Sequence, residues 1–409
     1  MQRLSLWAER RSAPVVATAA MFVLVMAYSL LGNPVLHLGS SRLLAPDDLW
    51  TLANASTAVL HGHLTQVYVP NEALTSPPGI VFVLLPSMAL GHVLGLSGHL
   101  HTAGDPQSMW FVLGPTALLL GSTLLFALDA VARAWSFPQR ARFALALVAA
   151  LGVANVVAIW GHPEDCAALA LVIWATLAVD RDGQAAVHRA AWLLGIGIVL
   201  QPLAVLGLVP VLARFGWRLG AAQWWRLALP TAVLVLFPLV AEPHETLFVL
   251  LHQPFELAHN SFTPLTHLAP DIGHGLNGGG PTRLVAVLVS AALAAVVCHR
   301  HYDLPTVLGI IAAAFFIRVL LETELNWYYL WPLLALCLLL SLRRSVARFG
   351  MCAGALVATM VLGNRIEHHI AAWWPALIGL LCVSLLAALP PPRRWIEWVS
   401  PHGGAPLPA

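Results

Sequence analysis

Long apolar runs separated by short polar segments dominate this chain, and their length predicts membrane-spanning helices. The runs lie near 14–34, 78–96, 109–132, 141–160, 165–179, 190–213, 227–241, 281–298, 304–321, 327–342, 349–363 and 371–389. A run of about 20 apolar residues crosses the hydrocarbon core as a helix. In lipid only helices and closed barrels satisfy their backbone, and the absence of strict alternation argues against a barrel. The sequence therefore predicts an all-α, polytopic integral membrane protein whose residues 1–409 form a single transmembrane domain.

The arginine clusters predict how these helices are oriented, because positive residues collect on the cytoplasmic side. The clusters lie at 3–11, 133–142, 181–189, 214–226, 343–348 and 393–394. If every run crossed the membrane, the clusters at 133–142 and 214–226 would lie outside. Two changes remove this conflict. We expect 78–96, which follows two prolines, to lie along the outer interface, and 190–213 to be broken at Gln201-Pro202 into two half-helices that return to the cytoplasm.

With these changes the chain has about 11 spans, a broken half-helix hairpin and an interfacial helix, with both termini cytoplasmic. The first external loop is 35–108 and the second is 242–280. Arg283 and Arg318 are among the few arginines that this map places outside. Acidic residues and histidines mostly lie outside too, so we expect the chemistry at the outer face.

Composition supports a membrane protein and excludes several other classes. Of 409 residues, 59% are hydrophobic and 10% are charged, and Asp and Glu together number 19. The net charge of +2 forms no basic stripe, so no nucleic-acid partner is expected. The five cysteines show no paired spacing, so neither disulfides nor a zinc site is expected. Every basic residue apart from histidine is arginine, which suggests a GC-rich bacterial genome.

Four polar clusters fall on the outer face of this map and are candidates for a functional site. They are Arg42 with Asp47, Asp48 and the amphipathic stretch to His61 and His63; His162 with Glu164 and Asp165; Gln201-Pro202; and Arg318 with Glu322, Glu324, Asn326, Tyr328 and Tyr329. An ionisable group at membrane depth costs roughly 2.5–3.5 kcal/mol unless it faces a cavity or a partner. Several such groups at one level predict a shared polar cavity that opens outward.

Structural explanations exist for two of these clusters. Asp48 is a suitable N-cap for a helix beginning at Leu49, with Asp47 as a solvated loop residue. Pro163 followed by Glu164 and Asp165 is also a favourable helix start, because carboxylates stabilise the positive helix end.

The other clusters also allow structural explanations. Arg318 and Glu322 are four residues apart, so they can pair along one helix. Tyr328 and Tyr329 are suited to an aromatic belt at the membrane interface. The external histidines lack paired spacing, so a metal site is not expected, although a divalent cation at the aspartates stays open.

The order of these motifs resembles that of the GT-C membrane glycosyltransferases. The resemblance rests on the acid pair at 46–48, the segment 60–68, the double proline at 76–79, the break at 201–202 and the stretch 322–332. It covers most of the chain in layout, and its motifs are short. The branch that it most resembles comprises the polyprenol-phosphate-mannose-dependent mannosyltransferases of mycobacterial-type bacteria.

The resemblance implies an enzyme of the bacterial cytoplasmic membrane with an outward-facing active site. Such enzymes pass a sugar, here expected to be mannose, from a polyprenyl-phosphate donor to a hydroxyl group of a glycolipid or cell-wall glycan, with inversion. No cofactor is implied. One acid of the first loop is the general base, which would be Asp47, and Asp48 would orient the base or the acceptor.

The resemblance also implies a group that binds the leaving lipid phosphate. The candidates are Arg42, His162, Gln201 and Arg318, with substrate contacts also expected from Glu164, Glu322, Tyr328 and Tyr329. Two other functions are compatible with the sequence. The broken hairpin is also a feature of transporters and lipid flippases, and a non-catalytic member could serve as a scaffold for cell-envelope assembly.

Overall fold

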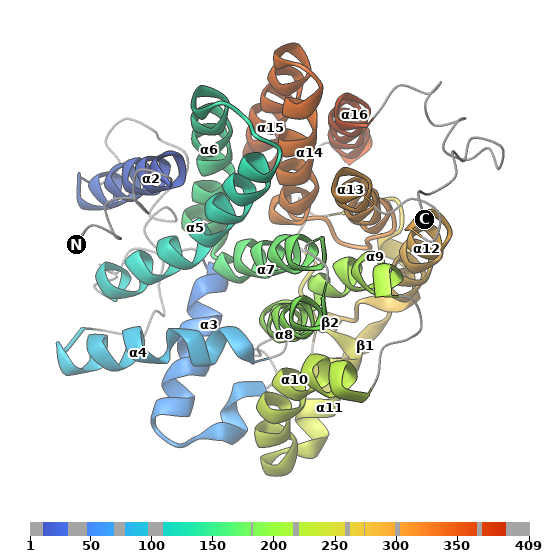
Figure 1. Cartoon of the computed structure of the whole chain (residues 1–409). Helices are drawn as coiled ribbons and strands as arrows, with labels where there is room; N and C mark the ends of the chain where they lie inside the picture. The colour runs from blue at the N-terminus through green and yellow to red at the C-terminus, as the bar shows by residue number, and fades with distance from the viewer. Residues whose placement is uncertain are drawn as a thin grey trace.

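The computed structural model describes most of the chain, and its described part is almost entirely helical (Figure 1). The described residues are 11–31, 47–68, 78–96, 109–180, 183–215, 221–257, 262–273, 275–298, 303–365 and 370–389. The prediction of an all-α architecture is confirmed, apart from one pair of short strands. Arg42, both ends of the chain and parts of the two expected external loops lie outside the described residues.

The α-helices are α2 (Ser12–Leu31), α3 (Asp47–Leu60), α4 (Gly79–Val93), α5 (Trp110–Ala134), α6 (Gln139–Ala154), α7 (Pro163–Val179), α8 (Gln184–Leu200), α9 (Val205–Phe215), α10 (Ala221–Ala241), α11 (Pro243–His252), α12 (Gly280–Cys298), α13 (Leu304–Leu320), α14 (Trp331–Arg344), α15 (Val346–Arg365) and α16 (Ile370–Ala388). Short helical turns are η2 (Leu64–Tyr68), η3 (Asn155–Trp160), η4 (Pro202–Ala204), η5 (Thr266–Leu268) and η6 (Trp327–Leu330). The strands β1 (Asp271–Gly273) and β2 (Leu276–Asn277) pair antiparallel.

Six of the described helices are long and apolar enough to cross a membrane, so the chain is a helical membrane protein. They are the segments 12–29, 110–134, 139–160, 223–241, 280–297 and 346–363. Five further apolar helices are shorter, including α4, α13 and both halves of the broken 190–213 run. The larger number of spans and the orientation of the termini stay predictions.

Helix α7 lies in the middle of the molecule, packed between α5 and α8 (Figure 1). Nearly every residue of α7 is buried, including Glu164 and Asp165 in its first turn. Helix α14 is buried along most of its length as well. The packing of α7 therefore fixes two carboxylates deep within the helical assembly, where burial is costly unless the groups are partnered.

The predicted break at Gln201-Pro202 is confirmed. Helix α8 ends at Leu200, Gln201 adopts an extended backbone with φ −152° and ψ 119°, and α9 begins at Val205 after a single turn. Proline lacks an amide hydrogen and cannot continue the hydrogen-bonding of the preceding helix, which explains the position of the break. The return of both half-helices to the cytoplasm stays a prediction.

The predicted amphipathic helix after Asp48 is also present, as α3. Leu52, Ala53 and Ser56 are buried on one face, as expected, whereas Leu60 is exposed at the helix end. The Ser56 hydroxyl donates to the Val81 carbonyl oxygen of α4, 3.0 Å away, so the two helices pack closely. Helix α4 has 15 residues, fewer than a typical span needs, and its place at the outer interface stays a prediction.

Candidate functional site

Polar side chains from distant parts of the chain line one cavity of about 580 Å³. Eight residues to which the sequence assigned a catalytic or substrate-binding role are among them: Asp48, His162, Glu164, Gln201, Arg318, Glu322, Tyr328 and Tyr329. A volume in this range is typical of sites for small molecules or cofactors. The cavity walls come from α3, the turn before α7, the break after α8, the segment after α11, α12, α13 and η6.

Two candidate residues are not placed at the cavity. Arg42 lies outside the described residues. Asp47 is the first residue of α3, and its side chain is likewise outside the described part.

Asp48 is not the N-cap of α3, so that structural explanation is wrong. The helix begins one residue earlier, at Asp47. The Asp48 carboxylate instead lies 2.8 Å from Nε2 of His162. Its side chain is 49% exposed and lines the cavity, so a bound molecule can reach it.

His162 is held from both ends of its ring. Nε2 contacts Asp48, and Nδ1 lies 2.7 Å from Oε1 of Glu164. The ring also stacks on Tyr328, with centroids 3.8 Å apart. Burial lowers the pKa of His162, but the Glu164 and Asp48 carboxylates outweigh it and raise the pKa above its usual value. The two carboxylates therefore favour the protonated imidazole, which donates from both nitrogens.

A local irregularity places His162 at this point. The end of the α6 segment forms a π-helical turn over 155–160, and Gly161 terminates it with φ 80°. Only glycine adopts this backbone readily. Pro163 then starts α7, so the imidazole lies at the junction of two helices. Such π-helical turns frequently accompany functional sites.

The two carboxylates after His162 have further interactions and unused acceptor atoms. Gln201 donates to Oδ1 of Asp165 at 2.5 Å. Among the described residues, Oε2 of Glu164 and Oδ2 of Asp165 are buried without a hydrogen-bond partner. Glu164 and Asp165 therefore do more than stabilise the positive end of α7, because Glu164 contacts His162 and Asp165 accepts from Gln201.

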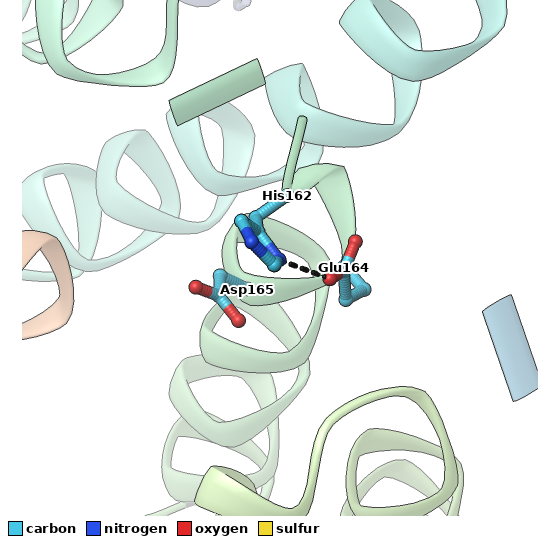
Figure 2. Close-up of side chains that lie close together, drawn as sticks. All are labelled: His162, Glu164 and Asp165. Carbon is cyan, nitrogen blue, oxygen red and sulfur yellow. Dashed lines mark hydrogen bonds and ion pairs between the residues drawn. The ribbon is translucent and has the colours of Figure 1, made fainter. Parts of the chain in front are cut away.

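His162, Glu164 and Asp165 could also hold a metal ion. Figure 2 shows the imidazole between the two carboxyl groups. One ligand atom from each lies within 4.8 Å of the others, and no further group of this kind occurs among the described residues. Because His162 already contacts both Asp48 and Glu164, a metal would have to displace one of these contacts.

Glu322, which also lines the cavity, lies between two arginines. Its Oε2 accepts from Nε of Arg283 at 3.0 Å, and its Oε1 lies 2.9 Å from Nε of Arg318. The expected pairing of Arg318 with Glu322 is thus present. Arg283 also donates to Gln253 at 2.9 Å, while the Arg318 guanidinium lies over the Tyr329 ring at 4.3 Å. Nη1 of Arg318 is buried and has no hydrogen-bond partner in the described part.

The aromatic residues after this pair form part of the core. Tyr328 is 7% exposed and Trp331 is fully buried, so they do not form a belt at the membrane surface. This corrects the alternative explanation of the motif. Tyr328 and Tyr329 pack edge to face, and Tyr328 carries the stacking contact with His162.

Glu324 is a second carboxylate near the arginine pair, and it also lines the cavity. Burial raises its pKa from 4.5 to about 7, although Arg283 acts in the opposite direction. Asn326 donates to Oε1 of Glu324 at 3.1 Å. Within the described part, Glu322 pairs with two arginines, whereas Glu324 forms no ion pair with an arginine. Because the pKa of Glu324 is about 7, its carboxyl group gains and loses its proton near neutral pH.

Sequence reasoning missed Arg283, although it had placed this arginine on the outer side. One feature of the sequence could have identified Arg283 as a candidate: it is one of the few arginines outside the clusters predicted to be cytoplasmic. Gln253 was missed as well, and it follows an ordinary-looking helix end with no motif around it.

Comparison with known proteins adds no relative: no protein-family model and no curated protein matches this chain.

Proposed function

We propose that the protein is an inverting glycosyltransferase that moves a sugar, mannose being the first expectation, from a polyprenyl phosphate to an acceptor hydroxyl. The reaction would occur at the outer face of the bacterial cytoplasmic membrane, with a glycolipid or cell-wall glycan as acceptor. The supporting observation is one cavity in a membrane protein that combines an accessible carboxylate with a pair of arginines. Glycosyl transfer from a lipid phosphate requires both groups, a base for the acceptor and positive charge for the leaving group.

The accessible carboxylate supports Asp48 as the base. In the proposed step the acceptor oxygen attacks the anomeric carbon, and its proton passes to the Asp48 carboxylate. The bond from the anomeric carbon to the phosphate oxygen breaks, and its electron pair leaves with the phosphate. The resemblance assigned the base to Asp47, whose side chain lies outside the described part, and of the two neighbouring acids Asp48 is the one described at the cavity.

His162 would act as a positioning residue for this base. It binds one oxygen of Asp48 and is itself fixed by Glu164 and by stacking on Tyr328. The second oxygen of Asp48 is then free to face the acceptor. A charged imidazole next to the base also balances part of the negative charge that the donor phosphate brings.

The arginine pair would bind the donor phosphate. Arg283 and Arg318 carry two positive charges against the single charge of Glu322, so this ion cluster has a net charge of +1. Guanidinium groups bind phosphate through parallel hydrogen bonds. The unpartnered Nη1 of Arg318 provides a donor that no described protein group uses.

The test is transfer of mannose from polyprenyl-phosphate mannose by the purified protein in proteoliposomes, with membrane glycolipids as acceptors. Wild type should release polyprenyl phosphate only when acceptor is present. Asp48→Asn should lower the rate by about 10²–10⁴-fold, the range for loss of a general base. The rate of Asp47→Asn is measured at an equal amount of folded protein. A loss in this variant and not in Asp48→Asn would assign the general base to Asp47. Full activity in both variants would remove the acid pair from the mechanism.

A lipid-linked-sugar flippase is the second candidate, and the broken helix at Gln201 favours it. Gln201 and Pro202, at the break between α8 and α9, line the cavity. Interrupted helices form substrate sites in many transporters. The same proteoliposomes separate the two functions. Movement of the labelled donor between leaflets without release of polyprenyl phosphate would support the flippase.

A further inference from the structure

We propose that the turn between α5 and α6 and the turn between α14 and α15 together bind the headgroup of an anionic phospholipid. Trp135 lies in the first of these turns, Arg140 lies in the first turn of α6, and Arg343 lies at the end of α14. Both arginines are exposed. None of the three residues lines the cavity, so the lipid site does not depend on the proposed glycosyl transfer.

The packing of α6 against α14 brings the two turns to the same level. Gly152 of α6 lies directly against the ring of Trp331, at the start of α14. Arg140 comes 12 residues before Gly152, and Arg343 comes 12 residues after Trp331. At about 1.5 Å per residue, each arginine is roughly 18 Å from that contact along its helix. The Arg343 guanidinium also lies over the Trp135 ring, 5.1 Å from its centroid, so the two turns are adjacent.

The charge of these turns is positive. No aspartate or glutamate occurs in the stretches 130–163 and 325–366, which contain both turns. The acid just before the first stretch, Asp129, is already bound by two arginines. Among the described residues, neither Arg140 nor Arg343 forms an ion pair. The described part of the protein therefore leaves their charge for an anionic ligand.

Apolar side chains beside the arginines favour a lipid as this ligand. Trp135 and Phe137 pack edge to face with centroids 5.8 Å apart, and Val346 in the other turn is 82% exposed. Helices α5, α6 and α15 are among the segments long enough to cross a membrane, so these turns lie where the helices leave the hydrocarbon layer. Aromatic rings at this level contact the boundary between acyl chains and headgroups, and arginines attract anionic lipids there.

The lipid site and the cavity lie at opposite ends of the α6 segment. His162, which lines the cavity, follows the other end of this segment. A phosphate bound by Arg140 and Arg343 would connect α6 to α14, since guanidinium groups donate parallel hydrogen bonds to phosphate oxygens. A ligand that binds only the folded protein raises its stability as the ligand concentration rises. Anionic lipid should therefore raise the unfolding temperature.

The experiment uses the full chain in mixed micelles of detergent and phosphatidylcholine, into which phosphatidylglycerol is titrated. The unfolding temperature is recorded at each mole fraction, and the mole fraction that gives half of the maximal rise measures binding. We expect a saturable rise with phosphatidylglycerol and none with the same amount of additional phosphatidylcholine. Glycerol 3-phosphate at equal concentration should give no rise, because it lacks acyl chains. Added salt should weaken binding, because it screens the exposed charges.

Single variants assign the lipid to the two turns. Arg140→Gln and Arg343→Gln should each raise the half-maximal mole fraction about fivefold, the effect of one arginine at an anionic lipid surface. Arg189→Gln is the matched control, because it removes an exposed arginine on α8 whose guanidinium donates to the Ala185 carbonyl oxygen. It should leave the titration unchanged. Each rise is measured from the same variant's unfolding temperature in phosphatidylcholine alone, so altered basal stability does not affect the result.

Four outcomes would overturn the proposal. Equal responses of the wild type to phosphatidylglycerol and phosphatidylcholine would mean that no anionic headgroup is recognised. An equal rise with glycerol 3-phosphate would indicate a site for a soluble anion. Unchanged titrations in both Arg140→Gln and Arg343→Gln would exclude these turns, and an equal weakening in Arg189→Gln would show that the lipid responds to overall charge.

Discussion

Two buried carboxylates in this protein each lie between two arginines, and the two clusters differ in what surrounds them. Asp129 on α5 accepts from Arg142 at 2.7 Å and from Arg11 at 3.2 Å, so each of its oxygens has one arginine. Glu322 is bound in a similar way by Arg283 and Arg318. The Glu322 cluster borders the cavity, and the Asp129 cluster does not.

The comparison shows that an ion cluster alone does not indicate a binding site. The Asp129 cluster joins α5 and α6 to the residue just before α2, so its role is to hold these elements together. The Glu322 cluster has a guanidinium nitrogen without a described partner and an open space beside it. Contact with the cavity and an unused donor thus distinguish the Glu322 cluster from the Asp129 cluster.

The largest expected effect is on stability, and it should occur in both clusters. Asp129→Asn leaves two arginines without their carboxylate, which should lower the free energy of unfolding by about 3–5 kcal/mol. Glu322→Gln should cause a loss of similar size. Thermal unfolding in detergent measures both. Donor binding by the folded fraction should change only in Glu322→Gln, and an equal change in Asp129→Asn would remove the distinction between the clusters.

The next effect depends on pH and concerns Glu324, next to the Glu322 cluster. Its carboxyl group has a pKa of about 7 in the folded protein, against 4.5 normally. Between these values the folded protein binds more protons than the unfolded chain, so stability falls as pH rises. The penalty is absent below pH 4.5 and complete above pH 7.

Glu324→Gln removes this penalty, so it should stabilise the protein at pH 8 by up to about 3 kcal/mol and have little effect at pH 4.5. Unfolding temperatures of variant and wild type across this range test the expectation. A constant difference at all pH values would mean that Glu324 does not titrate here.

A smaller effect is expected from Arg318, the arginine of the Glu322 cluster whose Nη1 has no described hydrogen-bond partner. Arg318→Gln removes a guanidinium that would bind the donor phosphate in the proposed function, and we expect donor affinity to fall by about 2 kcal/mol, roughly 30-fold. Titration of polyprenyl-phosphate mannose into the purified variant measures it. Arg11→Gln changes the partly exposed arginine of the other cluster and serves as the control. Similar affinity in the two variants would contradict the assignment of Arg318.

The sequence predicted the features that depend on local pattern. Apolar run length indicated the membrane helices, proline indicated the break after Gln201, and the spacing of Arg318 and Glu322 indicated their ion pair. The apolar spacing after Asp48 likewise indicated the buried face of α3. Each of these follows from rules that act within one helix or turn.

The sequence could not predict the contacts that depend on tertiary packing. His162 meets Asp48 across 114 positions, and Arg283 meets Glu322 across 39. Such pairs form only because α3, α7, α12 and α13 are brought around one cavity. The N-cap explanation for Asp48 was also wrong, because α3 begins at Asp47. Capping rules consider only neighbouring residues, so they could not predict the contact of Asp48 with His162.

The most direct test of the central claim compares sugar transfer by wild type, Arg283→Gln and Arg142→Gln in proteoliposomes at equal amounts of folded protein. Each variant removes one arginine from a buried carboxylate, but only Arg283 lines the cavity. The account predicts acceptor-dependent transfer by wild type, at least a tenfold loss in Arg283→Gln and near-normal turnover in Arg142→Gln. No transfer by wild type, or equal losses in the two variants, would contradict it.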